Sequence, residues 1–229
     1  MPKLDIKFDC CITDPPYGST FCKWDSVIPF EPMWKELKRL VKSNGAICLF
    51  GSEPFSSALR MSNVKMFKYD WIWNKKLAGN GMQAKNNPLK IHEICSVFNG
   101  NAYYPQKTVG KMVKKLYRLK SSEIYDGESV PSEYINNLYY PVSIVEFSIP
   151  RVGRLHPTQK PVALLEYLIK TYTNEGEIVL DFTAGSGTTG VAAMETNRRC
   201  VLIEKDEKYC EITIKRLKDK EKEIAERLF

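Results

Sequence analysis

The chain reads Glu-Ile-Val-Leu-Asp-Phe-Thr-Ala-Gly-Ser-Gly-Thr-Thr-Gly from residue 177 to residue 190, and this stretch decides the fold class. Residues 178–180 form a short apolar run, which predicts a buried parallel strand. A tight loop with two glycines follows, and we expect a helix to begin after it, with Thr188 or Thr189 as its N-cap. Strand, glycine loop and helix form the first half of a nucleotide-binding unit, because the glycines let a ligand approach the backbone and the helix N-terminus offers free N–H groups.

The residues that follow this stretch indicate which kind of nucleotide the loop could bind. A second strand is predicted at residues 200–203, and Glu204 at its end can accept hydrogen bonds from both hydroxyls of a ribose. Gly185, Gly187 and Gly190 have the G-x-G-x-x-G spacing that dinucleotide sites also use, but no lysine follows the loop as a P-loop requires. The loop therefore need not hold phosphate, and a nucleoside such as S-adenosylmethionine fits better. A tight αβ connection without a ligand is the plainer alternative.

Length and composition indicate one α/β domain with an insertion. The 229 residues are 43% hydrophobic and 27% charged, and no apolar run approaches the ~20 residues of a membrane-spanning helix. The N-terminus has no signal-peptide pattern, the seven cysteines are irregularly spaced, and there are only two histidines. We therefore expect a cytoplasmic protein with reduced cysteines, no metal site and no membrane partner.

The net charge of +7 is unevenly distributed along the chain. Between residues 75 and 154 there are twelve Lys and Arg against six Asp and Glu, so nearly all of the positive excess lies in this central block. The block is also rich in tyrosine. A basic block with aromatics is typical of a surface that binds a phosphate backbone, although a solvated loop region can have the same composition.

Alternating strands and helices flank that central block. Strands are predicted at residues 8–13, 46–50, 69–73 and 91–98, the last two antiparallel, and helices at 30–42, 54–61, 161–173 and 206–229. Residues 74–150 lack helical periodicity and contain many glycines and asparagines, so we expect loops, short strands and little core there. This order favours one mixed sheet with an irregular insertion.

The first predicted strand ends in Asp14-Pro15-Pro16-Tyr17. The two prolines stop the strand and keep the backbone extended. They place an acid and an aromatic ring at the carboxyl end of a strand, where open α/β sheets bind ligands. A plain strand-to-loop turn is the alternative interpretation of this short motif.

Three motifs in a fixed order resemble the β-class amino-methyltransferases of DNA: Asp14-Pro15-Pro16-Tyr17, then His156-Pro157-Thr158-Gln159-Lys160-Pro161, then Asp181-Phe182-Thr183-Ala184-Gly185-Ser186-Gly187. The resemblance covers nearly the whole chain. It implies a Rossmann-like, S-adenosylmethionine-dependent methyltransferase sheet with an inserted irregular target-recognition region. Residues 1–98 would form the catalytic half, 99–155 the target-recognition insertion, and 156–229 the cofactor-binding half of the same domain.

The resemblance also assigns residues to roles. Asp14, Pro15, Pro16 and Tyr17 would be catalytic. The cofactor would contact Asp14, His156, Thr158, Lys160, Asp181, Phe182, Thr183, Gly185, Ser186, Gly187 and Glu204, with the glycine loop along its methionine part and Glu204 on its ribose. No metal is implied.

Two departures from the family pattern stand out. The family usually has Asp-Pro-Phe where this chain has Asp181-Phe182-Thr183, which leaves open where the Phe182 ring lies. Many relatives also carry a Gly-Asp segment ahead of the catalytic motif that contacts the adenine of the cofactor. Only thirteen residues precede Asp14 and none forms that segment, so we expect either that this strand is missing or that another part of the chain replaces it.

The implied reaction is methyl transfer to an exocyclic amino group of a base flipped out of duplex DNA. Asp14 and the carbonyl oxygen of Pro15 would accept the two amino hydrogens, and Tyr17 would stack on the base. Aspartate at the first motif position is more typical of enzymes that act on adenine N6, so we predict a site-specific, adenine-specific DNA-methyltransferase of restriction-modification or phage type. Cytosine N4 is the alternative base.

Other classes remain as alternatives. RNA and protein-glutamine methyltransferases use a similar motif, usually with asparagine first, and the basic block weighs against them. A non-catalytic DNA-binding subunit is a third possibility, although intact Asp14 and Tyr17 favour activity. The expected partner is double-stranded DNA, and a homodimer is possible because relatives often form one.

Overall fold

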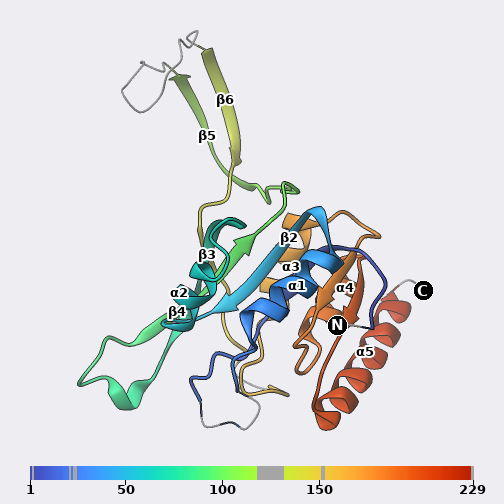
Figure 1. Cartoon of the computed structure of the whole chain (residues 1–229). Helices are drawn as coiled ribbons and strands as arrows, with labels where there is room; N and C mark the ends of the chain where they lie inside the picture. Colours follow the sequence, from blue (N-terminus) through green and yellow to red (C-terminus); the bar gives the residue numbers. More distant parts are fainter. Residues whose placement is uncertain (2, 21, 23–24, 118–131, 151–152, 228–229) are drawn as a thin grey trace. The chain divides into compact units, whose positions relative to one another are not determined.

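The computed structural model describes residues 1–229 except 2, 21, 23–24, 118–131, 151–152 and 228–229. It divides into two compact units, a larger one of Met1–Tyr104 with Ser143–Phe229 and a smaller one of Pro105–Val142 (Figure 1). The smaller unit lies inside the stretch 99–155 that the sequence assigns to the insertion. Among the described residues, no helix is long and apolar enough to cross a membrane.

The larger unit is built on a seven-stranded sheet with the order β7-β3-β4-β2-β1-β8-β9 (Figure 1). Its strands are β1 (Phe8–Thr13), β2 (Val41–Gly51), β3 (Phe67–Gly79), β4 (Lys90–Phe98), β7 (Ile144–Glu146), β8 (Ile178–Asp181) and β9 (Arg199–Leu202). Only β4 runs against its neighbours β2 and β3, and the other pairings are parallel. The predicted α/β class with a Rossmann-like mixed sheet is confirmed.

Helices cover both faces of this sheet. Successive side chains of the central strands point to opposite faces, and both sets are apolar, so each face needs a covering layer. Ile12 and its neighbours pack against α3 (Val162–Tyr172) and α4 (Thr188–Glu195). Cys11 and its neighbours pack against α1 (Phe30–Leu40) and α2 (Phe55–Met61). The helix α5 (Glu207–Arg227) follows β9. The two cores hold β1 and β8 in the middle of the sheet, which fixes the ends of these strands.

Two local predictions are wrong. Helix α1 ends at Leu40 rather than at residue 42, because Val41 is already extended (φ −86°, ψ 137°) and pairs with Phe8 of β1. The N-cap of α4 is Gly187 in the left-handed conformation (φ 74°) rather than a threonine. The Thr189 hydroxyl donates to Asp181 instead, which takes this side chain away from capping.

The smaller unit contains a two-stranded antiparallel ribbon of β5 (Thr108–Tyr117) and β6 (Ser132–Tyr139). The sequence predicted only loops and short strands here. Val109, Met112 and Ile135 of this ribbon are more than half exposed, so no buried stripe marked the strands in the sequence. Beyond the ribbon, residues 74–150 also supply β7, the whole of β4 and the last part of β3 to the main sheet. The ribbon strands, of ten and eight residues, are longer than the short strands predicted here, whereas β7, of three residues, is a short strand as predicted.

Candidate active site

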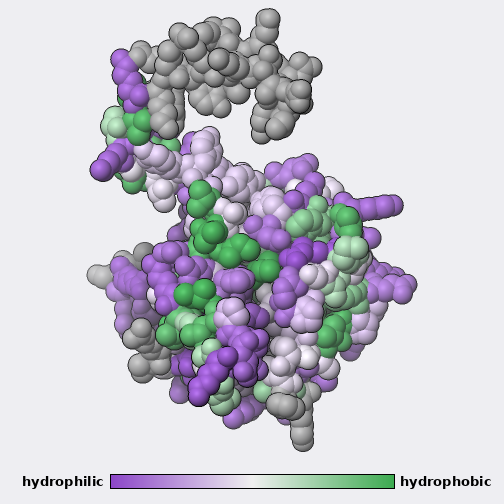
Figure 2. Space-filling model, turned by 90° about the vertical axis from the view of Figure 1, so that its left-hand side faces the viewer, coloured by the Kyte–Doolittle hydropathy of each residue, from purple (hydrophilic) through white to green (hydrophobic). Residues whose placement is uncertain are grey.

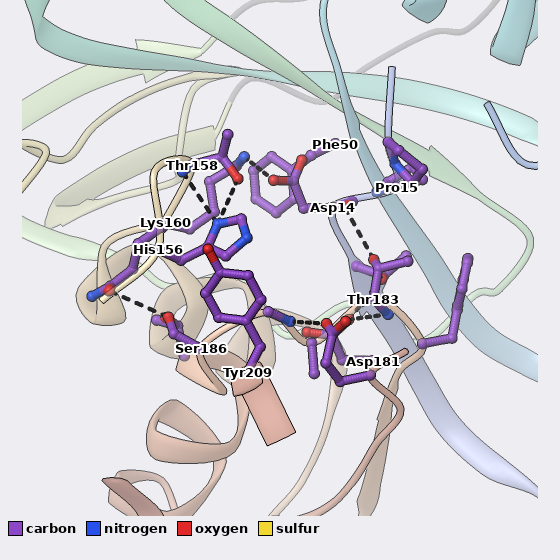
Figure 3. Close-up of a pocket in the computed structure, with 18 of the residues that line it drawn as sticks. Asp14, Pro15, Phe50, His156, Thr158, Lys160, Asp181, Thr183, Ser186 and Tyr209 are labelled. Carbon is purple, nitrogen blue, oxygen red and sulfur yellow. Dashed lines mark hydrogen bonds and ion pairs between the residues drawn. The ribbon is translucent and has the colours of Figure 1, made fainter. Parts of the chain in front are cut away.

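A cavity of about 350 Å³ opens at the carboxyl ends of β1 and β8, within the size range of small-molecule sites (Figure 3). Parallel neighbouring strands place their ends at the same edge, so motifs far apart in sequence meet there. Residues from all three sequence motifs line the cavity, and they include Asp14, Pro15, Pro16, Tyr17, His156, Thr158, Lys160, Asp181, Phe182, Thr183, Gly185, Ser186 and Glu204. Gly187, the N-cap of α4, directly follows this lining.

Asp14 lies at the end of β1 with both carboxylate oxygens engaged. The Tyr17 hydroxyl donates to Oδ1, and the Lys160 ammonium donates to Oδ2. The Tyr17 ring stacks on Phe55 of α2, with 5.1 Å between ring centroids. Burial raises the pKa of Asp14 above its usual range, although Lys160 acts in the opposite direction. The motif thus presents a carboxylate whose orientation is fixed from two sides.

Lys160 connects Asp14 to a second acid from the middle of the sheet. Its side chain is only 7% exposed, and its Nζ lies 3.2 Å from Glu93 Oε2 on β4. Lys75 of β3 lies 3.3 Å from the other oxygen, Glu93 Oε1. Burial alone would lower the pKa of Lys160, but the carboxylates of Asp14 and Glu93 raise it overall. Lys160 therefore stays charged in this setting.

Asp181 joins the ends of β1 and β8 through threonine hydroxyls. Thr13 Oγ1 lies 2.6 Å from both Asp181 Oδ1 and Thr183 Oγ1. Thr183 Oγ1 donates to the carbonyl oxygen of Asp14 at 3.0 Å, and Thr189 donates to Asp181 Oδ2 at 2.5 Å. Burial raises the pKa of Asp181 to about 6, against these hydrogen bonds. Asp181 thereby fixes the backbone that carries the Asp14 carboxylate.

The glycine loop is held by its own hydrogen bonds. Glu204 Oε2 accepts the Gly185 N–H at 2.7 Å, and Oε1 accepts those of Lys205 and Asp206 at 2.8 and 2.9 Å. Arg216 of α5 donates to the Ser186 carbonyl oxygen at 2.9 Å. These hydrogen bonds fix the conformation of the loop. Each Glu204 oxygen has two acceptor positions, so Oε2 keeps one for a further donor.

The segment before α3 forms another wall of the cavity. His156 Nδ1 lies 3.0 Å from Thr158 Oγ1, and its ring packs against Tyr209 with 4.4 Å between centroids (Figure 3). Burial lowers the pKa of His156. Phe182 is 7% exposed and packs in the core beside α1 and α2 while also lining the cavity. This contact gives the position of the Phe182 ring, which the sequence did not decide.

Sequence reasoning missed several residues at this site. Glu93, Lys75 and Tyr209 lie outside the three motifs, and no local pattern links them to Asp14. Asp25 accepts the N–H groups of four successive residues, 17 to 20, and so shapes the loop after the catalytic motif. An acid a few residues after a Pro-Pro-Tyr-Gly loop was the one available signal. No group of three His, Cys, Asp or Glu suited to a metal occurs among the described residues.

Sequence comparisons agree with the motif order. The family model described as DNA methylase matches residues 8–215. The chain is 49% identical over 207 residues to the type II methyltransferase M2.DpnII of Streptococcus pneumoniae, which covers 85% of this chain and 70% of that protein. It is 28% identical over 236 residues to the DNA adenine methyltransferase YhdJ of Escherichia coli (strain K12), covering 91% and 76%.

Solved structures of similar fold include a DNA methyltransferase. The M1.HpyAVI-SAM complex superposes with a TM-score of 0.62 at 26% identity and covers 93% of this chain and 90% of that one. The PvuII DNA methyltransferase, described as cytosine-N4-specific, also gives 0.62, at 13% identity and with 91% and 78% covered. At that identity the likeness concerns the fold alone.

Proposed function

Since the chain belongs to the DNA methylase family, we propose that it transfers a methyl group from S-adenosylmethionine to the exocyclic N6 of adenine in duplex DNA. The observation that carries this proposal is the position of Asp14. Its carboxylate lines a ligand-sized cavity at the carboxyl ends of two central strands, between Tyr17 and Lys160. An oriented carboxylate in a cavity of this kind suits the binding of an amino group.

The residues of the cavity fit an S-adenosylmethionine molecule. Glu204 keeps an acceptor position for a ribose hydroxyl, while the Phe182 ring lies in the wall. Gly185 has a left-handed backbone (φ 53°) that L side chains rarely adopt, while a Cβ there would meet the His156 ring only at ordinary contact distance, 3.6 Å. We assign His156, Thr158, Asp181, Thr183, Ser186 and Gly187 to the same wall, with Asp181 and Thr183 acting through the backbone.

The chain's own residues would bind and orient the amino group of the base. When bound, S-adenosylmethionine supplies an electrophilic methyl group. Asp14 and the carbonyl oxygen of Pro15 accept the two amino hydrogens, which aims the nitrogen lone pair at the methyl group. These acceptors bind more strongly as positive charge develops on the nitrogen, so they stabilise the transition state more than the ground state. Phe55 occupies one face of Tyr17, and a flipped base would stack on the other.

Adenine is the base we favour. The first motif position is aspartate, and a 28% identical relative carries the name of an adenine methyltransferase. Because relatives such as M2.DpnII are named type II methyltransferases, we further propose a role in restriction-modification. Cytosine N4 is the second candidate, because the fold is shared with a cytosine-N4-specific enzyme.

Fewer basic residues of the central block are available to bind DNA phosphates than their number in the sequence suggests. Lys75 is 8% exposed and paired with Glu93, so it is not a phosphate contact. Lys76 pairs with Glu146 at 2.7 Å. We propose that Lys111 and the other basic residues of the smaller unit contact the phosphates, as expected for a target-recognition region. Figure 2 shows hydrophobic groups among hydrophilic ones on one face of the molecule.

The product identifies the reaction. The test incubates the protein with mixed-sequence duplex DNA and methyl-labelled S-adenosylmethionine, followed by nucleoside mass spectrometry. N6-methyladenine is the expected product. N4-methylcytosine would keep the fold and mechanism but overturn the assignment of the base. Absence of label, together with measured cofactor binding below detection, would favour a non-catalytic DNA-binding subunit.

A further inference from the structure

Lys160 is shared between two carboxylates, and only one of them belongs to the catalytic motif. It donates to Asp14 Oδ2 and lies 3.2 Å from Glu93 Oε2. Lys75 holds the opposite side of Glu93. The four groups form a row of alternating charge from β1 to β3, with no net charge. Buried charges require such pairing, because isolated ones are too costly to desolvate.

The two contacts of Lys160 differ in quality. Its contact to Asp14 satisfies hydrogen-bond geometry, whereas Glu93 Oε2 is a buried oxygen without a well-directed hydrogen bond among the described residues. Lys160 Nζ and Glu93 Oε2, 3.2 Å apart, form an ion pair, but their angles do not meet hydrogen-bond geometry. Glu93 thus offers Lys160 a second acceptor that lies within ion-pair distance but lacks a hydrogen bond.

The proposed reaction requires a second acceptor for the Lys160 ammonium. Asp14 has to accept a hydrogen from the target amino group while Tyr17 binds one of its oxygens and Lys160 the other, so each oxygen keeps one acceptor position. A full positive charge on Oδ2 also weakens this oxygen as a base. As the new N–C bond forms, the electron pair of the C–S bond moves to sulfur, and the nitrogen must release one proton. Asp14 can take that proton only if the charge of Lys160 is held elsewhere.

We propose that Glu93 is a positioning residue that takes the Lys160 ammonium when the target amino group binds Asp14. The inference rests on the proposed function and adds a residue outside the family motifs. Lys160 and then Lys75 lower the pKa of Glu93, and Lys75 sets how strongly Glu93 competes for Lys160. Asp14 Oδ2 then accepts the amino hydrogen first and the released proton afterwards.

The electrostatics of the row support this division of roles. Burial would raise the pKa of Glu93, but Lys160 and Lys75 lower it overall. The pKa of Asp14 is raised by burial, and Glu93 adds to this while Lys160 opposes it. The other titratable groups acting on this pair are Tyr17, His156 and Asp181. The row therefore favours the charged form of Glu93, while burial favours the protonated form of Asp14.

Two substitutions with opposite expected effects test the inference. Glu93→Gln keeps the shape but removes the charge, so Lys160 stays on Asp14 and the pKa of Asp14 falls. We expect the single-turnover methylation rate to fall by about tenfold, and the acidic limb of its pH profile to move down by about one unit. Lys75→Gln removes the competing cation, so Glu93 attracts Lys160 more strongly. The acidic limb should then move to higher pH.

The measurement is single-turnover methyl transfer from pH 5 to 9, with cofactor affinity by calorimetry and melting temperature recorded for each variant. Glu175→Gln, an exposed acid on the turn before β8, is the matched control and should behave as wild type. Unshifted profiles for both variants, or shifts in the same direction, overturn the inference while an active wild type leaves the proposed function intact. If Glu93→Gln does not fold, an unshifted profile of Lys75→Gln alone overturns it.

Discussion

The ends of β1 and β8 and the β5–β6 ribbon are built in opposite ways. At the strand ends, Asp14 and Asp181 are buried among hydrogen bonds from several elements. In the ribbon, the described apolar side chains are largely exposed, as at Val109 and Ile135. An isolated two-stranded ribbon is marginally stable in water, whereas strands between two packed faces are fixed. The comparison contrasts a closely hydrogen-bonded site with a sparsely packed ribbon, for which we propose a role in recognition.

The largest expected difference between the two regions is in stability. Leu168 of α3 is fully buried, and Leu168→Ala should lower the free energy of unfolding by about 2–5 kcal/mol through lost burial and a cavity. Leu138 of β6 is 41% exposed, and Leu138→Ala should change the free energy by less than about 0.5 kcal/mol. Urea unfolding followed by tryptophan fluorescence measures both. Similar losses for the two variants would contradict the comparison.

The burial of Asp181 at the site should make the free energy of unfolding depend on pH. The folded pKa of Asp181 is raised to about 6 from 3.8, so its contribution to stability is complete below pH 4 and is lost as the pH rises through 6. One pKa unit corresponds to about 1.4 kcal/mol, so the loss is about 3 kcal/mol.

Asp181→Asn should lack this decrease, so that its stability relative to wild type increases between pH 4 and pH 7. Denaturant unfolding at several pH values measures the difference. Asp219→Asn, an exposed acid on α5, is the matched control. Parallel curves for Asp181→Asn and wild type would show that the Asp181 carboxyl titrates as an ordinary exposed one.

The smallest expected effect tests the ribbon as a DNA surface. Lys111 of β5 is exposed, and Lys111→Ala should reduce the slope of log affinity against log salt by about one. Fluorescence anisotropy of labelled duplex DNA at 50–200 mM salt measures the slope. Lys218→Ala on α5 is the control. An equal reduction for both lysines would mean that the ribbon has no special part in binding phosphate.

The same contrast explains what could be predicted from the sequence. The strand, glycine loop and Asp14 motif are local patterns, so the sequence predicted the sheet and brought Asp14, Lys160 and Asp181 to one cavity. Glu93 and Lys75 meet Lys160 only through the pairing of β3 with β4, which leaves no local signal. The ribbon was missed because its strands bury no apolar stripe that a period of two would reveal.

Asp14→Asn tests the central claim most directly, because asparagine keeps the size of the side chain while removing the charge that accepts the amino hydrogens. The measurement is single-turnover methyl transfer to duplex DNA, with S-adenosylmethionine affinity by calorimetry on the same sample. We predict that the rate falls by about 10²–10³-fold while cofactor affinity stays within a few-fold of wild type. A variant that methylates at the wild-type rate would show that Asp14 does not orient the target nitrogen, and the account would be wrong.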